Sequence, residues 1–253
     1  NLLDCRVLTS LEGIIDVAIL RGSHSFVSDL VEHARVPVLK HSGELCHIYV
    51  DCDRPKPGVD AGAPVTSANY NLVDIKMALG IIVNSRCYEP YSCNSTNVVL
   101  VHQDIAPKFL PELAKAAQAN GIELHGDEAA IRILPAIKPA DSNEWRRPRK
   151  EIILAVGIVA SVEEAIAHIN EYGSHLADSI ISDDDATQNL FMREVDSAAV
   201  YTNASTCFTD GGEFGMGAEV GLSTDKLNAR GPIGLEDLTS MKYIVRGNGQ
   251  TRG

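Results

Sequence analysis

The chain has 253 residues, of which 45% are apolar, and its 22 Lys and Arg against 34 Asp and Glu give a net charge of -12. This length predicts one large domain or two small ones, with enough apolar surface for a core that needs no disulfide or metal staple. The acidic surface would repel phosphate backbones and anionic lipid, so we expect neither a nucleic-acid-binding nor a membrane-surface protein.

Helical and strand patterns alternate along the first half of the chain, which indicates an α/β fold with a parallel sheet. We predict, in chain order, a strand over 14–20, a helix over 26–33, strands over 36–39 and 46–50, a helix over 72–83, a strand over 98–101, a helix over 107–120 and a strand over 123–125. Three prolines and two glycines within residues 53–67 exclude a helix or a central strand there, so we expect a loop or linker.

The second half continues the alternation after a polar, irregular stretch over 137–150. Ser161 and Glu164 have the spacing of a capping box, and Gly173 would end that helix in a left-handed conformation. We predict a strand over 152–159, a helix from 161 to 172, a strand over 179–181, a helix over 185–195, a strand over 198–201 and a glycine-rich loop over 211–221.

The two ends and the cysteines carry little chemistry of their own. The start has neither Met nor a signal-peptide pattern, so we expect the chain to begin partway through a longer protein. No apolar run reaches the roughly 18–20 residues of a membrane span. The six cysteines are scattered, which predicts free thiols in a reducing compartment.

Cys93 is the candidate nucleophile, because it lies in a connection between a helix and a strand. Backbone N–H groups in such a turn can lower the pKa of a thiol and hold an oxyanion. The alternative is a small buried hydrophobic residue, which is what a lone Cys usually is.

Other clusters are weaker candidates. Zinc could bind among His41, Cys46, His47 and Cys52, but neighbours on a strand point to opposite faces, so we expect no metal. The three acids 183–185 precede a helix and are expected to cap it. The sequence contains no P-loop and no Gly-x-Gly-x-x-Gly fingerprint after a strand.

A family resemblance adds to this interpretation. Residues 203–232 read Asn-Ala-Ser-Thr-Cys-Phe-Thr-Asp-Gly-Gly-Glu-Phe-Gly-Met-Gly-Ala-Glu-Val-Gly-Leu-Ser-Thr-Asp-Lys-Leu-Asn-Ala-Arg-Gly-Pro. This run resembles the signature of gamma-glutamyl phosphate reductases, which belong to the aldehyde dehydrogenase superfamily and make glutamate 5-semialdehyde on the route to proline. The same reductase forms the C-terminal part of eukaryotic pyrroline-5-carboxylate synthase.

Further segments resemble the family in the same order along the chain: residues 15–23, 36–41, 46–51, 87–94, 164–174 and 195–198. The resemblance implies an aldehyde dehydrogenase-like α/β fold whose first part lies upstream of residue 1. It divides the chain into the second part of a Rossmann-type dinucleotide-binding domain over 1–75, with a Pro-rich insert over 53–70, and a cysteine-bearing catalytic domain over 76–232. The segment 233–253 would contain a C-terminal strand over 241–246, of the kind used for oligomerisation.

The resemblance also implies roles for single residues. Cys93 would form a thioester with the glutamyl group of L-glutamyl 5-phosphate, and Asn94 would lie at the oxyanion. Arg21, Gly22 and Ser23 would contact the cofactor NADPH. Substrate binding falls to Asn203, Lys226 and Arg230, although the two cations could equally be a surface pair. No carboxylate stands near Leu39, where hydrolytic relatives have the Glu that activates water.

The implied partners are the small-molecule substrate, further copies of the chain and glutamate 5-kinase. The implied compartment is the cytoplasm, or a mitochondrion or plastid if the chain is part of a eukaryotic bifunctional enzyme.

Five departures from the family pattern stand against full activity: Cys207 in place of Arg, Asn228 and Leu176 in place of His, Leu20 in place of Pro, and Asn97-Val98 in place of Glu-Thr. Two alternatives therefore stay open, a non-catalytic or weakened paralogue that acts in assembly or regulation, and an aldehyde dehydrogenase relative with another acyl substrate.

Overall fold

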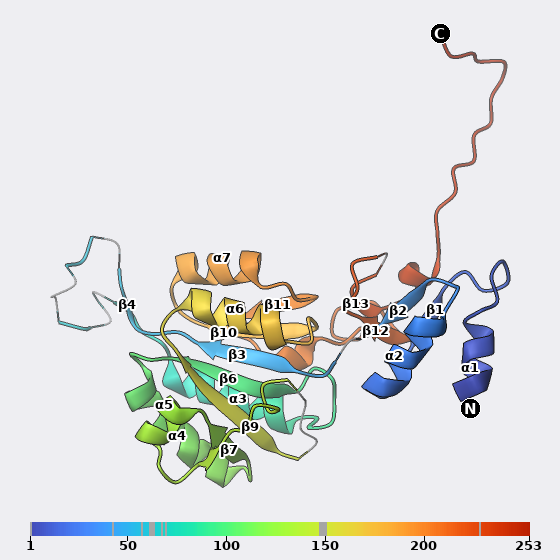
Figure 1. Ribbon diagram of the computed structural model, residues 1–253. Helices are drawn as coiled ribbons and strands as arrows, with labels where there is room; N and C mark the ends of the chain where they lie inside the picture. Colours follow the sequence, from blue (N-terminus) through green and yellow to red (C-terminus); the bar gives the residue numbers. More distant parts are fainter. Residues whose placement is uncertain are drawn as a thin grey trace.

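The computed structural model describes residues 2–41, 43–56, 58–60, 64–66, 68, 70–146, 151–227 and 229–253, and it divides into a larger and a smaller lobe (Figure 1). The larger lobe is built on seven parallel strands in the order β11-β10-β3-β6-β9-β7-β8. Their bounds are β3 (Cys46–Val50), β6 (Thr96–His102), β7 (Glu123–Gly126), β8 (Lys138–Pro139), β9 (Ile153–Val159), β10 (Ala177–Ile181) and β11 (Ala199–Thr202). The predicted α/β architecture with a parallel sheet is confirmed.

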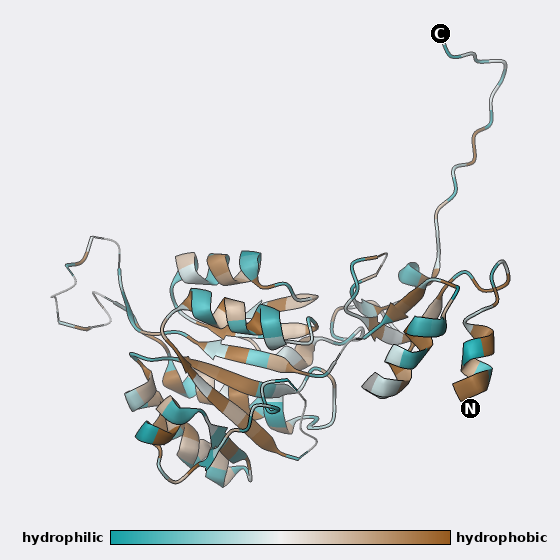
Figure 2. Cartoon of the chain, in the orientation of Figure 1, coloured by the Kyte–Doolittle hydropathy of each residue, from teal (hydrophilic) through white to brown (hydrophobic). Residues whose placement is uncertain are grey.

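Helices cover both faces of this sheet, as parallel strands require. One face is covered by α3 (Ile75–Cys87), α4 (Ala106–Ala119) and α5 (Glu128–Ile133), and the other by α6 (Val162–Tyr172) and α7 (Asp185–Glu194). Each face of the sheet packs against its helices in a separate apolar core. Adjacent residues of β6 point into different cores, since Val99 packs with residues of α4 and Leu100 packs with residues of α6. Figure 2 shows the strands brown between helices whose outer faces are teal.

The smaller lobe joins segments from both ends of the chain. Its elements are α1 (Leu2–Leu8), β1 (Ala18–Leu20), α2 (His24–His33), β2 (Val38–Lys40), β12 (Gly221–Ser223), β13 (Gly231–Ile233) and the 3-10 helix η2 (Glu236–Leu238). The strands β1 and β2 pair in parallel, and β12 and β13 pair antiparallel. Leu39 from the first pair packs on Ile233 from the second, which fixes the glycine-rich segment against the beginning of the chain.

The lobes divide between β2 and β3, earlier than the boundary that the sequence predicts at residue 75. The reason is that β3 pairs with β10 and β6 in the large sheet and not with the strands of the smaller lobe. The Pro-rich stretch follows β3, and its ends meet in a two-residue pairing of β4 (Arg54–Pro55) with β5 (Tyr70–Asn71). Residues 57, 61–63, 67 and 69 of the predicted insert lie outside the described residues.

Several predicted details are wrong, and each has a local cause. The first strand begins at Ala18 and not at 14, because the chain turns at Gly13 with φ +74. Gly173 ends α6 with φ -66 and not in the left-handed region. A Cβ there would lie 2.5 Å from the Ile169 carbonyl oxygen, so the glycine is needed for space. The elements α1, α5, β4, β5, β8, β12 and β13 were not predicted.

The C-terminal strand predicted over 241–246 is not formed. Residues 239–253 pair with no described strand and extend away from the smaller lobe (Figure 1). Tyr243 is 93% exposed and Val245 is 88% exposed, because the single chain offers this apolar segment no surface to cover. Among the described residues, no helix combines the length and apolar character needed to cross a membrane.

Candidate functional site

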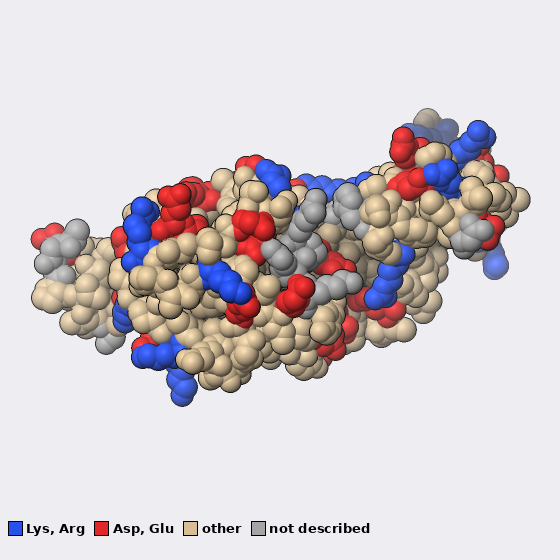
Figure 3. Space-filling model, turned by 60° about the horizontal axis from the view of Figure 1, so that its bottom comes forward, with Lys and Arg blue, Asp and Glu red and all other residues tan. Residues whose placement is uncertain are grey.

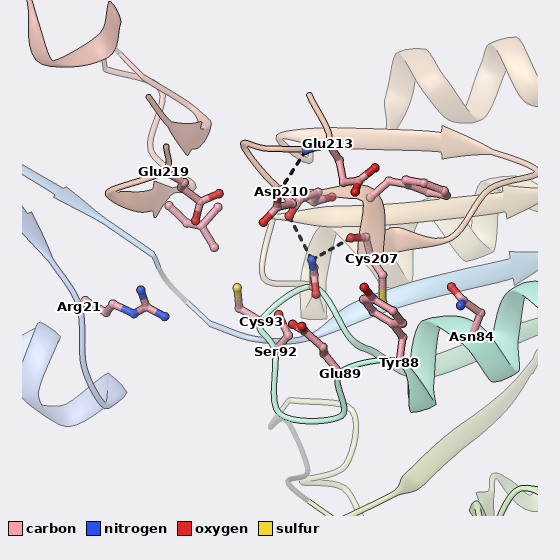
Figure 4. Close-up of a pocket in the computed structure, with 14 residues that line it drawn as sticks. Arg21, Asn84, Tyr88, Glu89, Ser92, Cys93, Cys207, Asp210, Glu213 and Glu219 are labelled. Atoms are coloured by element: carbon pink, nitrogen blue, oxygen red, sulfur yellow. Dashed lines mark hydrogen bonds between the residues drawn. The ribbon is translucent and has the colours of Figure 1, made fainter. Parts of the chain in front are cut away.

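A cavity of about 540 Å³ opens between the two lobes and contains Cys93 (Figure 4). The smaller lobe contributes Arg21, and Asp210, Glu213 and Glu219 reach the cavity from the glycine-rich segment and the residues before it, with Glu219 on the side of Arg21 (Figure 4). The lining residues are Arg21, Asn84, Tyr88, Glu89, Ser92, Cys93, Asn94, Cys207, Phe208, Thr209, Asp210, Glu213, Glu219 and Leu222. The cavity therefore brings together residues more than 200 positions apart in the sequence.

Cys93 lies in a tight connection between α3 and β6. The helix begins where the Asp74 carboxylate accepts a hydrogen bond from the Met77 N–H at 3.0 Å, and it ends at Cys87, three residues before Pro90. Two successive turns follow, in which Ser92 N–H donates to the Glu89 carbonyl and Ser95 N–H donates to the Ser92 carbonyl. These turns present the half-buried Cys93 side chain to the cavity.

The buried guanidinium of Arg86 fastens this connection. It donates to the Ile153 carbonyl at 3.0 Å, to the Pro90 carbonyl at 3.1 Å and to the Ser95 hydroxyl at 2.8 Å, and it also bonds the Glu151 carbonyl. Pro90 and Ser95 flank Cys93 on either side. Arg86 thus ties both ends of the cysteine-bearing turn to the start of β9.

Asn94 fastens the same turn to the glycine-rich segment. Its side-chain amide donates to the Cys207 carbonyl at 3.3 Å and to the Thr209 carbonyl at 3.0 Å, which occupies both amide hydrogens. The segment begins with the 3-10 helix η1 (Thr206–Phe208), whose Thr206 hydroxyl donates to the Asn94 carbonyl at 2.6 Å. The Asn94 side chain is therefore committed to structure, and the donors that remain beside the thiol are the backbone N–H groups of Cys93 and Asn94, neither of which donates to another backbone carbonyl in the described part of the chain.

The electrostatics of the cavity favour a protonated thiol. Burial and the nearby charge of Glu44 raise the pKa of Cys93, the Ser92 hydroxyl lowers it, and the net result is a pKa of about 11. Four carboxyl groups line the cavity, from Glu89, Asp210, Glu213 and Glu219, while Arg21 supplies the positive charge among the described lining residues. At neutral pH only a small fraction of Cys93 is thiolate in this structure.

This pKa leads to a measurable pH dependence. The rate of alkylation of Cys93 by iodoacetamide should rise about tenfold per pH unit between pH 7 and 10, because the thiolate is the reacting form. Glu44→Gln removes a like charge and should speed alkylation at pH 8 by about threefold, which a small electrostatic change in pKa would produce. Mass spectrometry of the Cys93 peptide gives the rates. Glu89→Gln is the matched control, since Glu89 also lines the cavity but is not among the groups that act most strongly on the pKa of Cys93. A rate that levels off below pH 9 would contradict the raised pKa.

The three predicted cofactor residues form the turn between β1 and α2. Arg21, Gly22 and Ser23 are all exposed, and Arg21 extends toward the cavity from the smaller lobe (Figure 4). Gly22 has no room for a side chain, since a Cβ would lie 2.7 Å from the Phe26 ring. The Ser23 hydroxyl caps α2 by accepting from the Phe26 N–H at 3.4 Å. A strand, a turn without bulk and a helix N-terminus are thus present as predicted.

The three predicted substrate residues lie outside the cavity. Asn203 ends β11 with φ +52, and its amide bonds the backbone N–H and carbonyl of Ser182. Lys226 Nζ lies 2.6 Å from the Asp196 carboxylate, and Arg230 Nη2 lies 2.9 Å from the same group. The lysine and arginine therefore share the Asp196 carboxylate as a partner, and none of the three predicted residues lines the cavity with Cys93.

The positions that depart from the family pattern are accommodated by their surroundings. Cys207 lines the cavity, and its thiol donates to the Ser85 carbonyl at 3.6 Å. Leu176 is fully buried in an apolar cluster that includes Cys46 and packs against Cys93. Leu20 belongs to the core of the smaller lobe, and the buried Asn97 amide donates to the Glu44 carbonyl at 3.0 Å. Asn228 lies outside the described residues.

Two of the residues that the sequence suggested as zinc ligands, Cys46 and His47, have other partners. The Cys46 thiol donates to the Cys93 carbonyl at 3.3 Å, whereas His47 Nδ1 lies 3.1 Å from the buried Asp178 carboxylate.

Asp184 caps α7 by accepting from the Thr187 N–H at 2.8 Å, as expected for this acidic run. Figure 3 shows Lys and Arg side chains interspersed with Asp and Glu over the face in view.

Sequence reasoning missed the acidic lining of the cavity. Glu213 and Glu219 stand in the glycine-rich run, and the Glu219 carboxylate accepts from the Gly211 N–H at 3.1 Å, which folds this loop back on itself. Asp210 does the same for the Gly212 N–H at 2.7 Å. The signal was the spacing of acids between the glycines, but the sequence does not say which acids face the cysteine.

Comparisons with known proteins identify relatives. The chain is 42% identical over 245 residues to gamma-glutamyl phosphate reductase of Limosilactobacillus reuteri, which covers 97% of this chain and 55% of that protein. Its counterpart from Carboxydothermus hydrogenoformans is 43% identical over 246 residues, with coverage of 97% and 55%. No protein-family model matches the chain.

Solved structures agree with these relatives. The crystal structure of gamma-glutamyl phosphate reductase from Thermotoga maritima superimposes with a TM-score of 0.88 and 35% identity, covering 100% of this chain and 56% of that one. An acetylating aldehyde dehydrogenase from Geobacillus thermoglucosidasius superimposes with a TM-score of 0.65 and 15% identity, covering 98% of this chain and 60% of that one. The fold is therefore that of aldehyde dehydrogenases. The resemblance is confirmed, and the chain is related to the C-terminal part of gamma-glutamyl phosphate reductases, spanning about 55% of the curated relatives it matches.

Proposed function

We propose that this chain is the cysteine-bearing part of an oxidoreductase that reduces L-glutamyl 5-phosphate to L-glutamate 5-semialdehyde and phosphate, a step of proline biosynthesis. The observation that carries the proposal is Cys93 in the cavity between the lobes, on a turn held by Arg86 and Asn94. The names of the relatives, at 42–43% identity over 97% of the chain, support the substrate and the reaction.

In the proposed reaction the Cys93 thiolate attacks the acyl carbon of glutamyl phosphate. The C–S bond forms, the bond from that carbon to the phosphate oxygen breaks, and phosphate leaves with its electron pair. Hydride addition to the thioester carbon gives a thiohemiacetal, which releases the aldehyde and returns the thiolate. The negative oxygen that develops in each step would lie beside the thiol, where the backbone N–H groups of Cys93 and Asn94 are the available donors.

A nicotinamide cofactor, NADPH by resemblance to the family, would supply the hydride when bound. The residues of the β1–α2 turn fit such a group, because the turn is exposed, leads into the N-terminus of α2 and brings the positive charge of Arg21 to the cavity. The Ser23 hydroxyl is engaged in capping, so Arg21 and the backbone would make the contacts. Leu39, where a hydrolytic enzyme would have its base, is buried against Ile233 and cannot activate water, which suits a reductase.

The test is NADP⁺ reduction with glutamate 5-semialdehyde, with and without inorganic phosphate. It is run on this chain and on a chimera in which the upstream segment of the Limosilactobacillus reuteri relative precedes residue 1. We expect phosphate-dependent turnover in the chimera. Turnover that needs no phosphate would show that an acceptor other than phosphate takes the acyl group from the thioester. A folded chimera without turnover would favour the non-catalytic alternative.

Lys226→Met should leave the KM for glutamate 5-semialdehyde unchanged within about twofold in the chimera. The reason is that the Lys226 ammonium pairs with Asp196 outside the cavity, and exposed ion pairs contribute little. Initial rates over a range of semialdehyde concentrations provide the KM. An increase of tenfold or more in this KM would show that Lys226 does bind the substrate.

A further inference from the structure

A second group of reactive side chains lies at the opposite end of the large sheet from Cys93. Cys52 follows the carboxyl end of β3, His102 is the last residue of the neighbouring β6, and Asp104 comes two residues later. One ligand atom from each side chain lies within 4.8 Å of the other two. In Figure 1 this corner is where β3 points away from the smaller lobe, toward β4.

The three side chains differ in exposure in the way that a metal site needs. Cys52 is 8% exposed and His102 is 6% exposed, so the sulfur and the imidazole are shielded from bulk water. The Asp104 side chain is 71% exposed, which leaves an entrance for an ion. The Asp104 N–H donates to His102 Nδ1 at 3.2 Å, which places the lone pair of Nδ1 on the side of Asp104.

The spacing of His102 and Asp104 is close to that of two ligands of a small tetrahedral ion, and the Cys52 sulfur lies within 4.8 Å of both. His102 Nδ1 lies 3.7 Å from the Asp104 carboxylate. Zinc bonds of about 2.0–2.2 Å place two ligands of one tetrahedral ion roughly 3.4 Å apart, so these groups need to approach by only a few tenths of an ångström. Coordination at Nδ1 would replace the long bond from the Asp104 N–H.

We propose that Cys52, His102 and Asp104 bind one Zn²⁺ ion, with the fourth position held by water. The donor set of a thiol, an imidazole and a carboxylate is the one that zinc prefers, whereas Mg²⁺ and Ca²⁺ favour oxygen alone. Binding releases the thiol proton of Cys52 to solvent, and no electron is transferred.

The neighbours of the three ligands are already engaged. Asp53 accepts from the Val73 N–H at 2.9 Å and lies 3.8 Å from Lys108 Nζ. Asp51 accepts from Arg54 at 2.8 Å and from the Ser182 hydroxyl at 2.8 Å. These carboxylates are therefore not the fourth ligand. The ion would instead join the ends of two central strands at the point where the Pro-rich stretch leaves the sheet.

The test is a titration of the 253-residue chain with Co²⁺ and with Zn²⁺, in a Cys93→Ser background that removes the cavity thiol. We expect one Co²⁺ per chain, with a thiolate-to-cobalt charge-transfer band that Zn²⁺ displaces. Cys52→Ser should abolish that band, and Asp104→Asn should weaken Co²⁺ binding at least tenfold. Cys87→Ser, which removes a half-buried thiol elsewhere, should change neither.

Two results would overturn the proposal. One is a charge-transfer band that survives Cys52→Ser, and the other is no binding by the parent chain at micromolar metal. Because Cys52 is buried, circular dichroism must show that its variant is folded. Asp104 is exposed, so its variant tests the site without that risk, and unchanged affinity in Asp104→Asn would also exclude the proposed ligand set.

Discussion

Replacing Cys93 by alanine is expected to abolish phosphate-dependent turnover in the chimera, by about 10⁴-fold or more, since removing the nucleophile of a covalent mechanism has effects of that size. No other described residue can form the thioester from the same position. The side chain is small and half-buried, so we expect the melting temperature to change by no more than a few degrees. Initial rates of NADP⁺ reduction and thermal unfolding measure the two quantities.

Cys207 provides the matched control, because it is a second thiol in the same cavity. Its sulfur is directed to the Ser85 carbonyl, and burial raises its pKa. Cys207→Ala should therefore keep at least a tenth of the parental rate. If Cys93→Ala retained activity while Cys207→Ala lost it, the nucleophile would be Cys207 and the assignment by resemblance would fail.

Local pattern was sufficient to predict six of the seven strands of the large sheet, all except β8, but not their order. The run Cys46–Val50 is mostly apolar and is buried on both faces, which is typical of a central parallel strand, and β3 has those bounds. Nothing in that run says that its neighbours are β6 and β10, so the predicted domain boundary came too late in the chain. The short elements α5 and β8 were not predicted, because six and two residues are too few to show a hydrophobic periodicity.

The site shows the same division between local and long-range information. Cys93 and Arg21 could be placed at one cavity through the family resemblance, and the structure brings them together. Lys226 and Arg230 were assigned to substrate because a cation in a glycine-rich run suits an anionic ligand. Their actual partner, Asp196, stands 30 residues before Lys226, and only the packing of the smaller lobe against β11 makes that contact.

Arg86 was not singled out by the sequence, yet its replacement should have the largest effect on stability. Arg86→Met keeps the apolar stem but leaves the carbonyls of Ile153, Pro90 and Glu151 without their donor. An unsatisfied buried acceptor costs roughly 1–3 kcal/mol. We therefore expect the free energy of unfolding to fall by about 3 kcal/mol or more, measured by urea denaturation of the 253-residue chain.

The control is Arg132→Met, at an exposed position in the last turn of α5, which should change stability by no more than about 0.5 kcal/mol. Arg86→Lys should fall between the two, because an ammonium keeps the charge but cannot reproduce the planar fork of donors. Equal stability of Arg86→Met and Arg132→Met would refute this role.

The same bonds hold Pro90 and Ser95 on either side of Cys93. Arg86→Lys, if folded, should therefore also lower kcat in the chimera more than it raises KM, because a misplaced nucleophile weakens the transition state rather than substrate binding.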